Sequence, residues 1–165
     1  MNSKQSIVSG RTCALAVGLI FTILGVAAFI PGLVSLPASA VSTGTPLSAD
    51  DIPLTAGTDY VDGFVRGFGY LFGLFPTNTL RNILSLVLGS IGLVSATGDR
   101  GSYNYNRFCA IFLPLVALLG LLPASNNVLG SMPLFGNDVW LSVIAGAIAV
   151  YGMVTGYKPE GEIPT

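Results

Sequence analysis

Residues 78–96, NTLRNILSLVLGSIGLVSA, join a short polar stretch to an apolar run of membrane length. Arg81 lies at the mouth of this run, with Asn78 and Asn82 beside it in the sequence. An arginine in such a place is an anchor in the membrane interface, a helix-packing device or a binding site. The rest of the sequence has to be weighed before these three roles can be separated.

The composition of the chain is that of a membrane protein. Of its 165 residues, 52% are hydrophobic and 9% are charged, whereas soluble domains carry about 25% charged residues. Seven basic and eight acidic residues leave a net charge of −1, which is too small for a nucleic-acid partner. Lipid is therefore the expected solvent, and the bilayer the first expected partner.

The residue types that most often carry catalysis or bind metals are scarce. Histidine is absent, and Cys13 and Cys109 are far apart in the sequence, so neither a zinc spacing nor a disulfide framework is visible. We therefore expect no enzymatic activity, no metal and no cofactor.

Four apolar segments of about 20 residues, the length needed to cross a bilayer, predict an all-α integral-membrane four-helix bundle. They cover residues 12–34, 79–96, 107–122 and 139–155, within a single membrane domain of residues 1–165. Gly and Pro residues near their ends are typical of helix termini.

The basic residues predict the orientation of these spans. Most of them fall on one side: Lys4, Arg11, Arg100, Arg107 and Lys158, against Arg66 and Arg81 on the other. An excess of positive charge marks the cytoplasmic side, so both termini are expected in the cytoplasm and the loop of residues 35–78 on the extracytoplasmic side. The aromatic residues near the span ends are expected at the membrane interface: Trp140, Tyr70, Tyr103, Tyr105, Tyr151 and Tyr157.

The long first loop has two parts with different expectations. Residues 59–75 place aromatic and apolar side chains at steps of three or four residues, a spacing that predicts an interfacial helix. The preceding part contains Ala38-Ser39-Ala40, a pattern that signal peptidases read, so cleavage there is an open alternative.

Short matches between the two halves predict an internal duplication of a two-helix unit. Residues 11–14 (RTCA) and 107–110 (RFCA) open the first and third spans, and residues 74–78 (LFPTN) and 134–137 (LFGN) precede the second and fourth. Small residues also recur four apart within the spans, which lets helix backbones approach closely in lipid. These small residues predict packing inside the bundle or, alternatively, a homodimer face.

The duplication makes the starts of the second and fourth spans equivalent and predicts a contact between Arg81 and Asp138. Asn78 and Asn137 are expected to cap these helices through their side-chain oxygens. Two alternatives stay open for Arg81: it reaches the phosphate headgroups, or it binds an anionic ligand. The candidate polar cluster comprises Asn78, Arg81, Asn82, Ser85, Asn137, Asp138 and Ser142.

The segments GLFPTNTLRNILSLVLGSIGL, GNDVWLSVIAGAIAVYGMV and RTCALAVGLIFTILGVAAFIPG resemble a bacterial membrane family known as domain of unknown function 4383. The resemblance implies a four-span bundle in the bacterial inner membrane or, in a cyanobacterium, the thylakoid. Family members tend to carry histidines at positions that correspond to Arg81, Ser85 and Ser142. A metal, haem or proton-relay role that rests on those histidines therefore does not transfer to this chain.

Two classes of function follow from the sequence. The first is a structural or accessory subunit that packs against a larger membrane complex or against further copies of itself. The second is a binding or transport module for a small molecule, lipid or ion, with its site at the outer mouth near Arg81 and Asp138.

Overall fold

The computed structural model describes residues 9–35, 69–122 and 132–156. Four α-helices dominate it: α1 (Gly10–Ala27), α4 (Thr79–Ser95), α5 (Asp99–Leu121) and α6 (Asn137–Thr155). The short elements are the 3-10 helix η1 (Pro31–Leu33) and the strands β1 (Val34–Ser35), β2 (Gly69–Leu71) and β3 (Phe75–Thr77). The predicted all-α class is confirmed. Residues 38–40, where cleavage was considered, and residues 59–68 lie outside the described residues.

Two bounds of the helices differ from the predicted spans by more than two residues. α1, α5 and α6 are long and apolar enough to cross a membrane, and α4 is a shorter apolar helix. α5 begins at Asp99 rather than at residue 107, so the polar residues 99–106 belong to the helix. An acidic residue in the first turn of a helix favours this earlier start. α1 ends at Ala27, short of residue 34, and Pro31 begins η1 instead.

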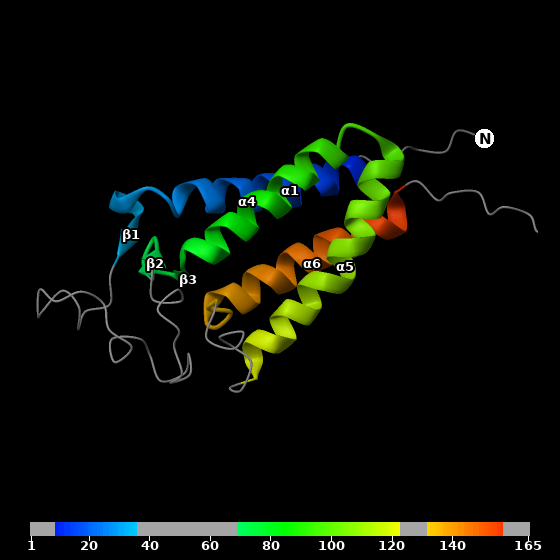
Figure 1. Cartoon of the computed structure of the whole chain (residues 1–165). Coiled ribbons are helices and arrows are strands. Elements are labelled where there is room, and N and C mark those ends of the chain that lie inside the picture. The colour runs from blue at the N-terminus through cyan, green and yellow to red at the C-terminus, as the bar shows by residue number, and fades with distance from the viewer. Residues whose placement is uncertain (1–8, 36–68, 123–131, 157–165) are drawn as a thin grey trace, which may run out of the picture.

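The four helices form two packed pairs, α1 with α4 and α5 with α6 (Figure 1). We call the end of the bundle that carries the strands and the starts of α4 and α6 the sheet end. The opposite end, where α1 begins, α6 ends and α4 turns into α5, is the terminal end (Figure 1). The described chain thus begins and finishes at the same end of the bundle.

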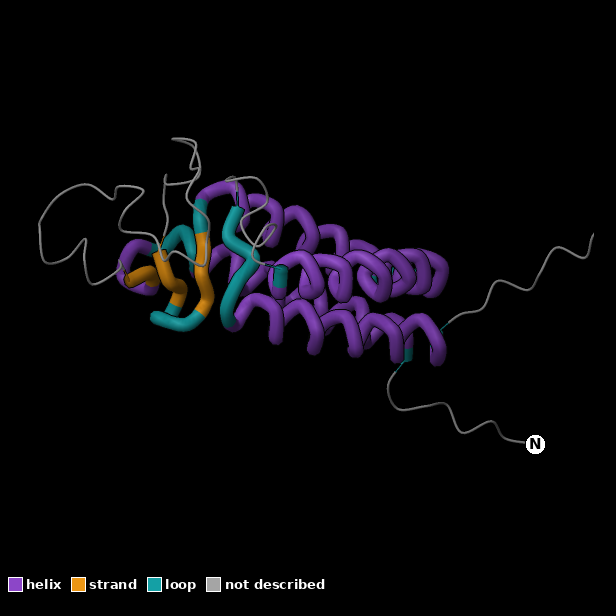
Figure 2. Tube along the Cα trace, turned by 90° about the horizontal axis from the view of Figure 1, so that it is seen from below, coloured by secondary structure: helices purple, strands orange, loops and turns teal. Residues whose placement is uncertain are grey.

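A small antiparallel sheet closes the sheet end, with strand order β1-β2-β3 (Figure 2). Leu71 of β2 pairs with Val34 of β1 on one side and with Phe75 of β3 on the other. The prediction of an interfacial helix is therefore wrong for residues 69–75. The chain reverses at Phe72 and Gly73, both at positive φ, and glycine adopts this conformation without steric cost.

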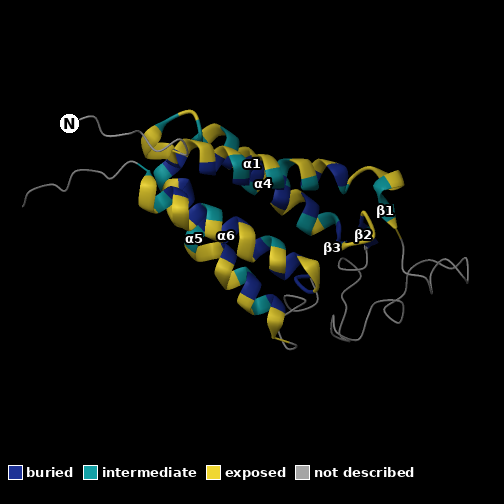
Figure 3. Ribbon diagram, turned by 180° about the vertical axis from the view of Figure 1, so that it is seen from behind, coloured by how far each residue is buried: buried dark blue, intermediate teal, exposed yellow. Residues whose placement is uncertain are grey.

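The core lies where the two helix pairs meet, and exposed residues lie on the outer faces (Figure 3). Many of these exposed residues are large and apolar. The core cluster comprises Ala14, Val17, Phe21, Tyr105, Cys109, Leu113, Ala145 and Ala149. Tyr105 was expected at the membrane interface, and that prediction is wrong: its ring is buried, and its hydroxyl donates to Leu88 O at 3.2 Å. The early start of α5 places Tyr105 well inside the helix.

Small residues bring α1 and α4 into close contact. A Cβ added to Gly18 would lie 2.8 Å from Leu93 N, and one added to Gly89 would lie 2.5 Å from Thr22 N. Both helices therefore approach each other backbone to backbone, as small residues permit in lipid. The predicted packing role inside the bundle is confirmed for these glycines, which face α4 and α1 respectively rather than a second copy. The internal duplication stays a prediction.

Candidate functional site: a polar clamp at the sheet end

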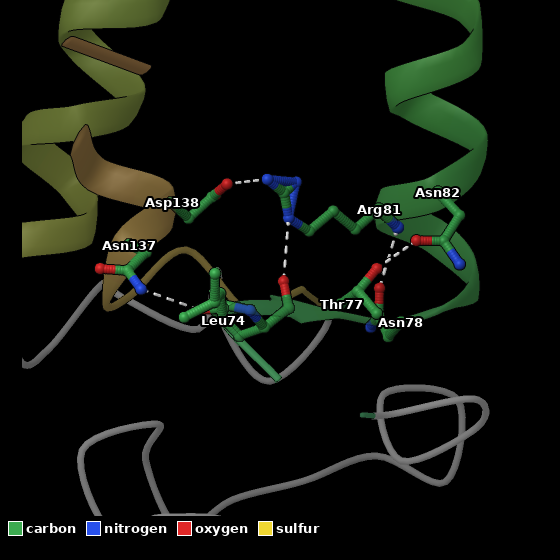
Figure 4. A network of polar contacts seen from close by, with 8 residues as sticks. Leu74, Thr77, Asn78, Arg81, Asn82, Asn137 and Asp138 are labelled. Atoms are coloured by element: carbon green, nitrogen blue, oxygen red, sulfur yellow. Dashed lines mark hydrogen bonds and ion pairs between the residues drawn. The ribbon is translucent and has the colours of Figure 1, made fainter. Parts of the chain in front are cut away.

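Arg81 and Asp138 form an ion pair between α4 and α6 (Figure 4). Each residue lies in the first turn of its helix, and the two side chains are only 11% and 2% exposed. The predicted contact is confirmed. The alternative in which Arg81 reaches out to headgroups is wrong, because its guanidinium is turned into the bundle.

The surroundings of this pair explain how two charges can lie inside the bundle. The N-terminus of α6 carries a partial positive charge that favours the Asp138 carboxylate, whereas the start of α4 disfavours a cation. Arg81 is compensated by two acceptors: the carboxylate of Asp138 and, through Nε, the Pro76 carbonyl at 3.2 Å. Removing one partner of a buried pair typically costs about 3–5 kcal/mol, because the other charge is left uncompensated.

Asn78 and Asn82 lie at the start of α4, and Asn82 connects it to the end of α1. The side-chain oxygen of Asn78 accepts from Arg81 N at 2.8 Å, so the predicted N-cap of α4 is confirmed. Asn82 Nδ2 donates to Ala28 O, the C-cap residue of α1, at 3.1 Å. The hydroxyl of Thr77 donates to the side-chain oxygen of Asn82. These bonds hold β3, α4 and α1 together.

Asn137 does not cap α6, so that prediction is wrong. The N-cap residue is Gly136, at a φ of 68°, and Asn137 is already the first helical residue. Its Nδ2 instead donates to Leu74 O at 3.2 Å (Figure 4). The glycine adopts a left-handed conformation at the cap position, and this turns the asparagine toward the hairpin between β2 and β3.

Ser85 and Ser142 line an apolar crevice that begins at the ion pair. The crevice has a volume of about 230 Å³ and lies between α4 and α5, with Phe21 of α1 among its lining residues. Arg81 and Asp138 line it together with the two serines, and its remaining walls are almost entirely apolar. The structure thus brings four of the seven candidate residues to one place. Asn78, Asn82 and Asn137 lie outside this lining: Asn78 caps α4, and Asn82 and Asn137 contact other segments.

We define the polar clamp as Thr77, Asn78, Arg81, Asn82, Asn137 and Asp138, together with the backbone carbonyls that they contact. It ties the β2–β3 hairpin, α4 and α6 together (Figure 4). Through Asn82 it also reaches the end of α1. Its chemistry is that of hydrogen bonds and one ion pair. Among residues 9–35, 69–122 and 132–156, no three side chains of the His, Cys, Asp and Glu types gather as metal ligands would.

Two polar residues at the terminal end were missed by the sequence reasoning. Asn106 is fully buried and donates from Nδ2 to Gly10 O at 2.7 Å. Arg11 donates to Ala96 O and Thr97 O, each at 2.9 Å, and so satisfies carbonyls at the end of α4. The burial of Asn106 could have been predicted from its spacing of three residues from Cys109, which places both residues on one helix face.

Fold and clamp together define a class: a small helical bundle with membrane-length helices, fastened at one end by a buried ion pair. A family model described as domain of unknown function (DUF4383) matches residues 11–155. The chain therefore belongs to the DUF4383 family, as its sequence resemblance indicated. No curated protein and no solved structure matches the chain.

Proposed function

We propose that the chain is an integral membrane protein of four spans, with the terminal end and both termini in the cytoplasm of a bacterium. Three helices have the required length, and α4, at a rise of about 1.5 Å per residue, extends about 25 Å alongside α1. The described arginines support this orientation. Arg11, Arg100 and Arg107 lie toward the terminal end, whereas Arg81 at the sheet end is paired with an acid.

Within that membrane we propose that the protein is a non-catalytic structural or accessory subunit that packs against a partner complex. The observation that carries this proposal is that polar side chains bond within the bundle, whereas large apolar side chains are exposed on its outer faces. The clamp residues use their polar groups to fasten the protein's own helices, while Val94, Ile111 and Trp140 are each about two-thirds exposed. Within lipid such outward faces are available to the helices of another protein.

Site-specific photo-crosslinking in native membranes, followed by mild-detergent purification, tests the proposal. A photoreactive side chain at Ile111, which is exposed on α5, is expected to capture a defined set of membrane proteins. The matched control at Leu113, which is buried on the same helix, is expected to yield only crosslinks within the chain. Equal capture from both positions, or recovery of the protein alone with one tightly bound small ligand, would overturn the subunit role.

A second candidate function, a binding module for a lipid or another apolar molecule, is supported by the crevice beside the ion pair. Its volume of about 230 Å³ exceeds that of an engineered apolar cavity of about 150 Å³ that binds benzene. Native mass spectrometry of protein purified directly from its membrane tests this candidate. One ligand retained in a 1:1 ratio would support it, and a chain that carries no ligand would contradict it.

A further inference from the structure

The polar lining residues of the crevice all lie toward its sheet end, beside apolar ones that include Val116 and Leu134, and the rest of the lining is apolar. Arg81, Asp138, Ser85 and Ser142 line it near the sheet end, and beyond them the lining along α4 continues through Leu88 to Ile91. On α5 the rings of Phe108 and Phe112 stack with centroids 5.1 Å apart and form part of the opposite wall. This layout matches an amphiphile with its polar group at the sheet end.

The crevice also opens onto the outer surface of the bundle. Leu84, Val87, Ile91 and Phe108 line it, and each is about half exposed. Residues 81–91 of α4 rise by about 15 Å, which is half of the roughly 30 Å hydrocarbon core of a bilayer. The crevice therefore reaches from the sheet end to about the depth of one lipid leaflet.

We propose that this crevice holds one acyl chain of a glycerophospholipid from the leaflet that borders the sheet end. The inference rests on the second candidate function and names its ligand. The ester carbonyl of the lipid accepts hydrogen bonds at the level of Ser85 and Arg81, and the chain lies along Leu88 and the phenylalanine rings.

Charge selects the esterified lipid over a free fatty acid. The ion pair of Arg81 with Asp138 carries no net charge, and the two serine hydroxyls are neutral donors. A neutral ester carbonyl fits this environment. The carboxylate of a fatty acid would be attracted by Arg81 but repelled by Asp138, so the cost of burying its charge in a largely apolar crevice would not be offset.

Native mass spectrometry of the full-length chain, released from nanodiscs, tests the inference. The nanodiscs contain equal amounts of diacyl phosphatidylcholine and its dialkyl ether analogue, which lacks the ester carbonyls, and a small fraction of free fatty acid. We expect one tightly held phospholipid per chain, with the diacyl form enriched about fivefold, as the loss of one net hydrogen bond implies. Retention of fatty acid instead, or equal retention of the ester and ether lipids, would overturn it.

Val87→Trp and its control Val94→Trp, both on α4, separate the crevice from the general lipid surface, and Ile91→Trp is a substitute for the first. Val87→Trp fills the crevice with a large ring and is expected to remove the retained lipid. Val94→Trp lies two turns further along the same exposed face, outside the crevice lining, and is expected to keep it. Ile91→Trp is the second variant if Val87→Trp does not fold; it blocks the deep end and is expected to favour lipids with shorter chains.

The outcomes also distinguish this inference from the function on which it rests. Retention of a non-lipid molecule from native membranes, in a chain that holds no phospholipid in nanodiscs, leaves the binding module standing and overturns the phospholipid assignment. A chain that retains nothing in either experiment overturns both. Equal lipid retention by Val87→Trp and Val94→Trp overturns the crevice as the binding place.

Discussion

The sheet end of the bundle is fastened by an ion pair between two helices, whereas the terminal end has side-chain bonds to backbone carbonyls and close backbone contacts. At the sheet end, long polar side chains span the distance between elements, as Arg81 of α4 does to reach Asp138 of α6 (Figure 4). Toward the terminal end, backbones touch directly: a Cβ added to Gly10 would lie 2.9 Å from Gly152 O, and one added to Gly92 would lie 2.7 Å from the Cα of Gly18.

Both kinds of contact suit the membrane location proposed above. In lipid, apolar side chains gain little from helix association, so stability comes from close packing or from polar bonds. Glycine permits the close packing, and the polar clamp supplies the polar bonds. The crevice between α4 and α5 lies beside the ion pair of the clamp.

The largest effect is expected from breaking the ion pair. Asp138→Ala should lower the free energy of unfolding by about 3–5 kcal/mol, because Arg81 is left as a buried charge without its partner. Denaturation of the purified protein in mixed detergent micelles measures this loss. The double variant Arg81→Ala/Asp138→Ala should lose less than the sum of the two single variants, and strictly additive losses would show that the pair is not coupled.

Adding a methyl group between the closely packed helices α1 and α4 is expected to lower the free energy of unfolding by a somewhat smaller amount. Gly89→Ala places a Cβ against the backbone of Thr22 and should lower the free energy of unfolding by about 1–3 kcal/mol, as overpacking does. Gly32→Ala is the matched control, since a Cβ there meets nothing within 4 Å. The same unfolding measurement applies, and equal losses in both variants would refute close packing as the reason.

The cap of α4 provides a third, smaller test within the clamp. Asn78→Ala should cost about 1 kcal/mol through loss of the acceptor for Arg81 N, and Asn78→Asp should restore most of it. Asn137→Ala, which removes no cap, should cost about 0.5 kcal/mol as the loss of one exposed hydrogen bond. A larger loss for Asn137→Ala than for Asn78→Ala would mean that the two asparagines have the opposite roles.

The smallest effect is expected at the terminal end. Arg11→Gln removes a cation from the carbonyls at the end of α4 and should lower stability by about 0.5 kcal/mol, with less effect at high salt. Arg107→Gln is the control, because no bond from Arg107 to another described residue is found. Thermal unfolding at low and high ionic strength would check this, and a loss that does not depend on salt would argue against the helix-end role.

The Arg81–Asp138 contact could be predicted because it rests on local signals. Each residue starts a helix, and the matched segments before them suggested equivalent levels in the bundle. The prediction of an interfacial helix was wrong for residues 69–75, because the spacing of apolar residues alone does not reveal a chain reversal at Gly73. The prediction that Asn137 caps α6 was wrong because Gly136 occupies the N-cap position. The prediction that Tyr105 lies at the interface was wrong because α5 begins at Asp99, earlier than predicted.

The sequence by itself determined the helical class, the membrane-length segments and the family, because apolar composition and helix-end residues are local properties of the chain. Only the tertiary structure decided that Arg81 is buried, that Asn106 reaches Gly10, and that a crevice opens beside the ion pair. Those features depend on how closely distant backbones approach one another. Which helix faces meet depends on packing across the whole bundle, and residues far apart in the sequence decide it together.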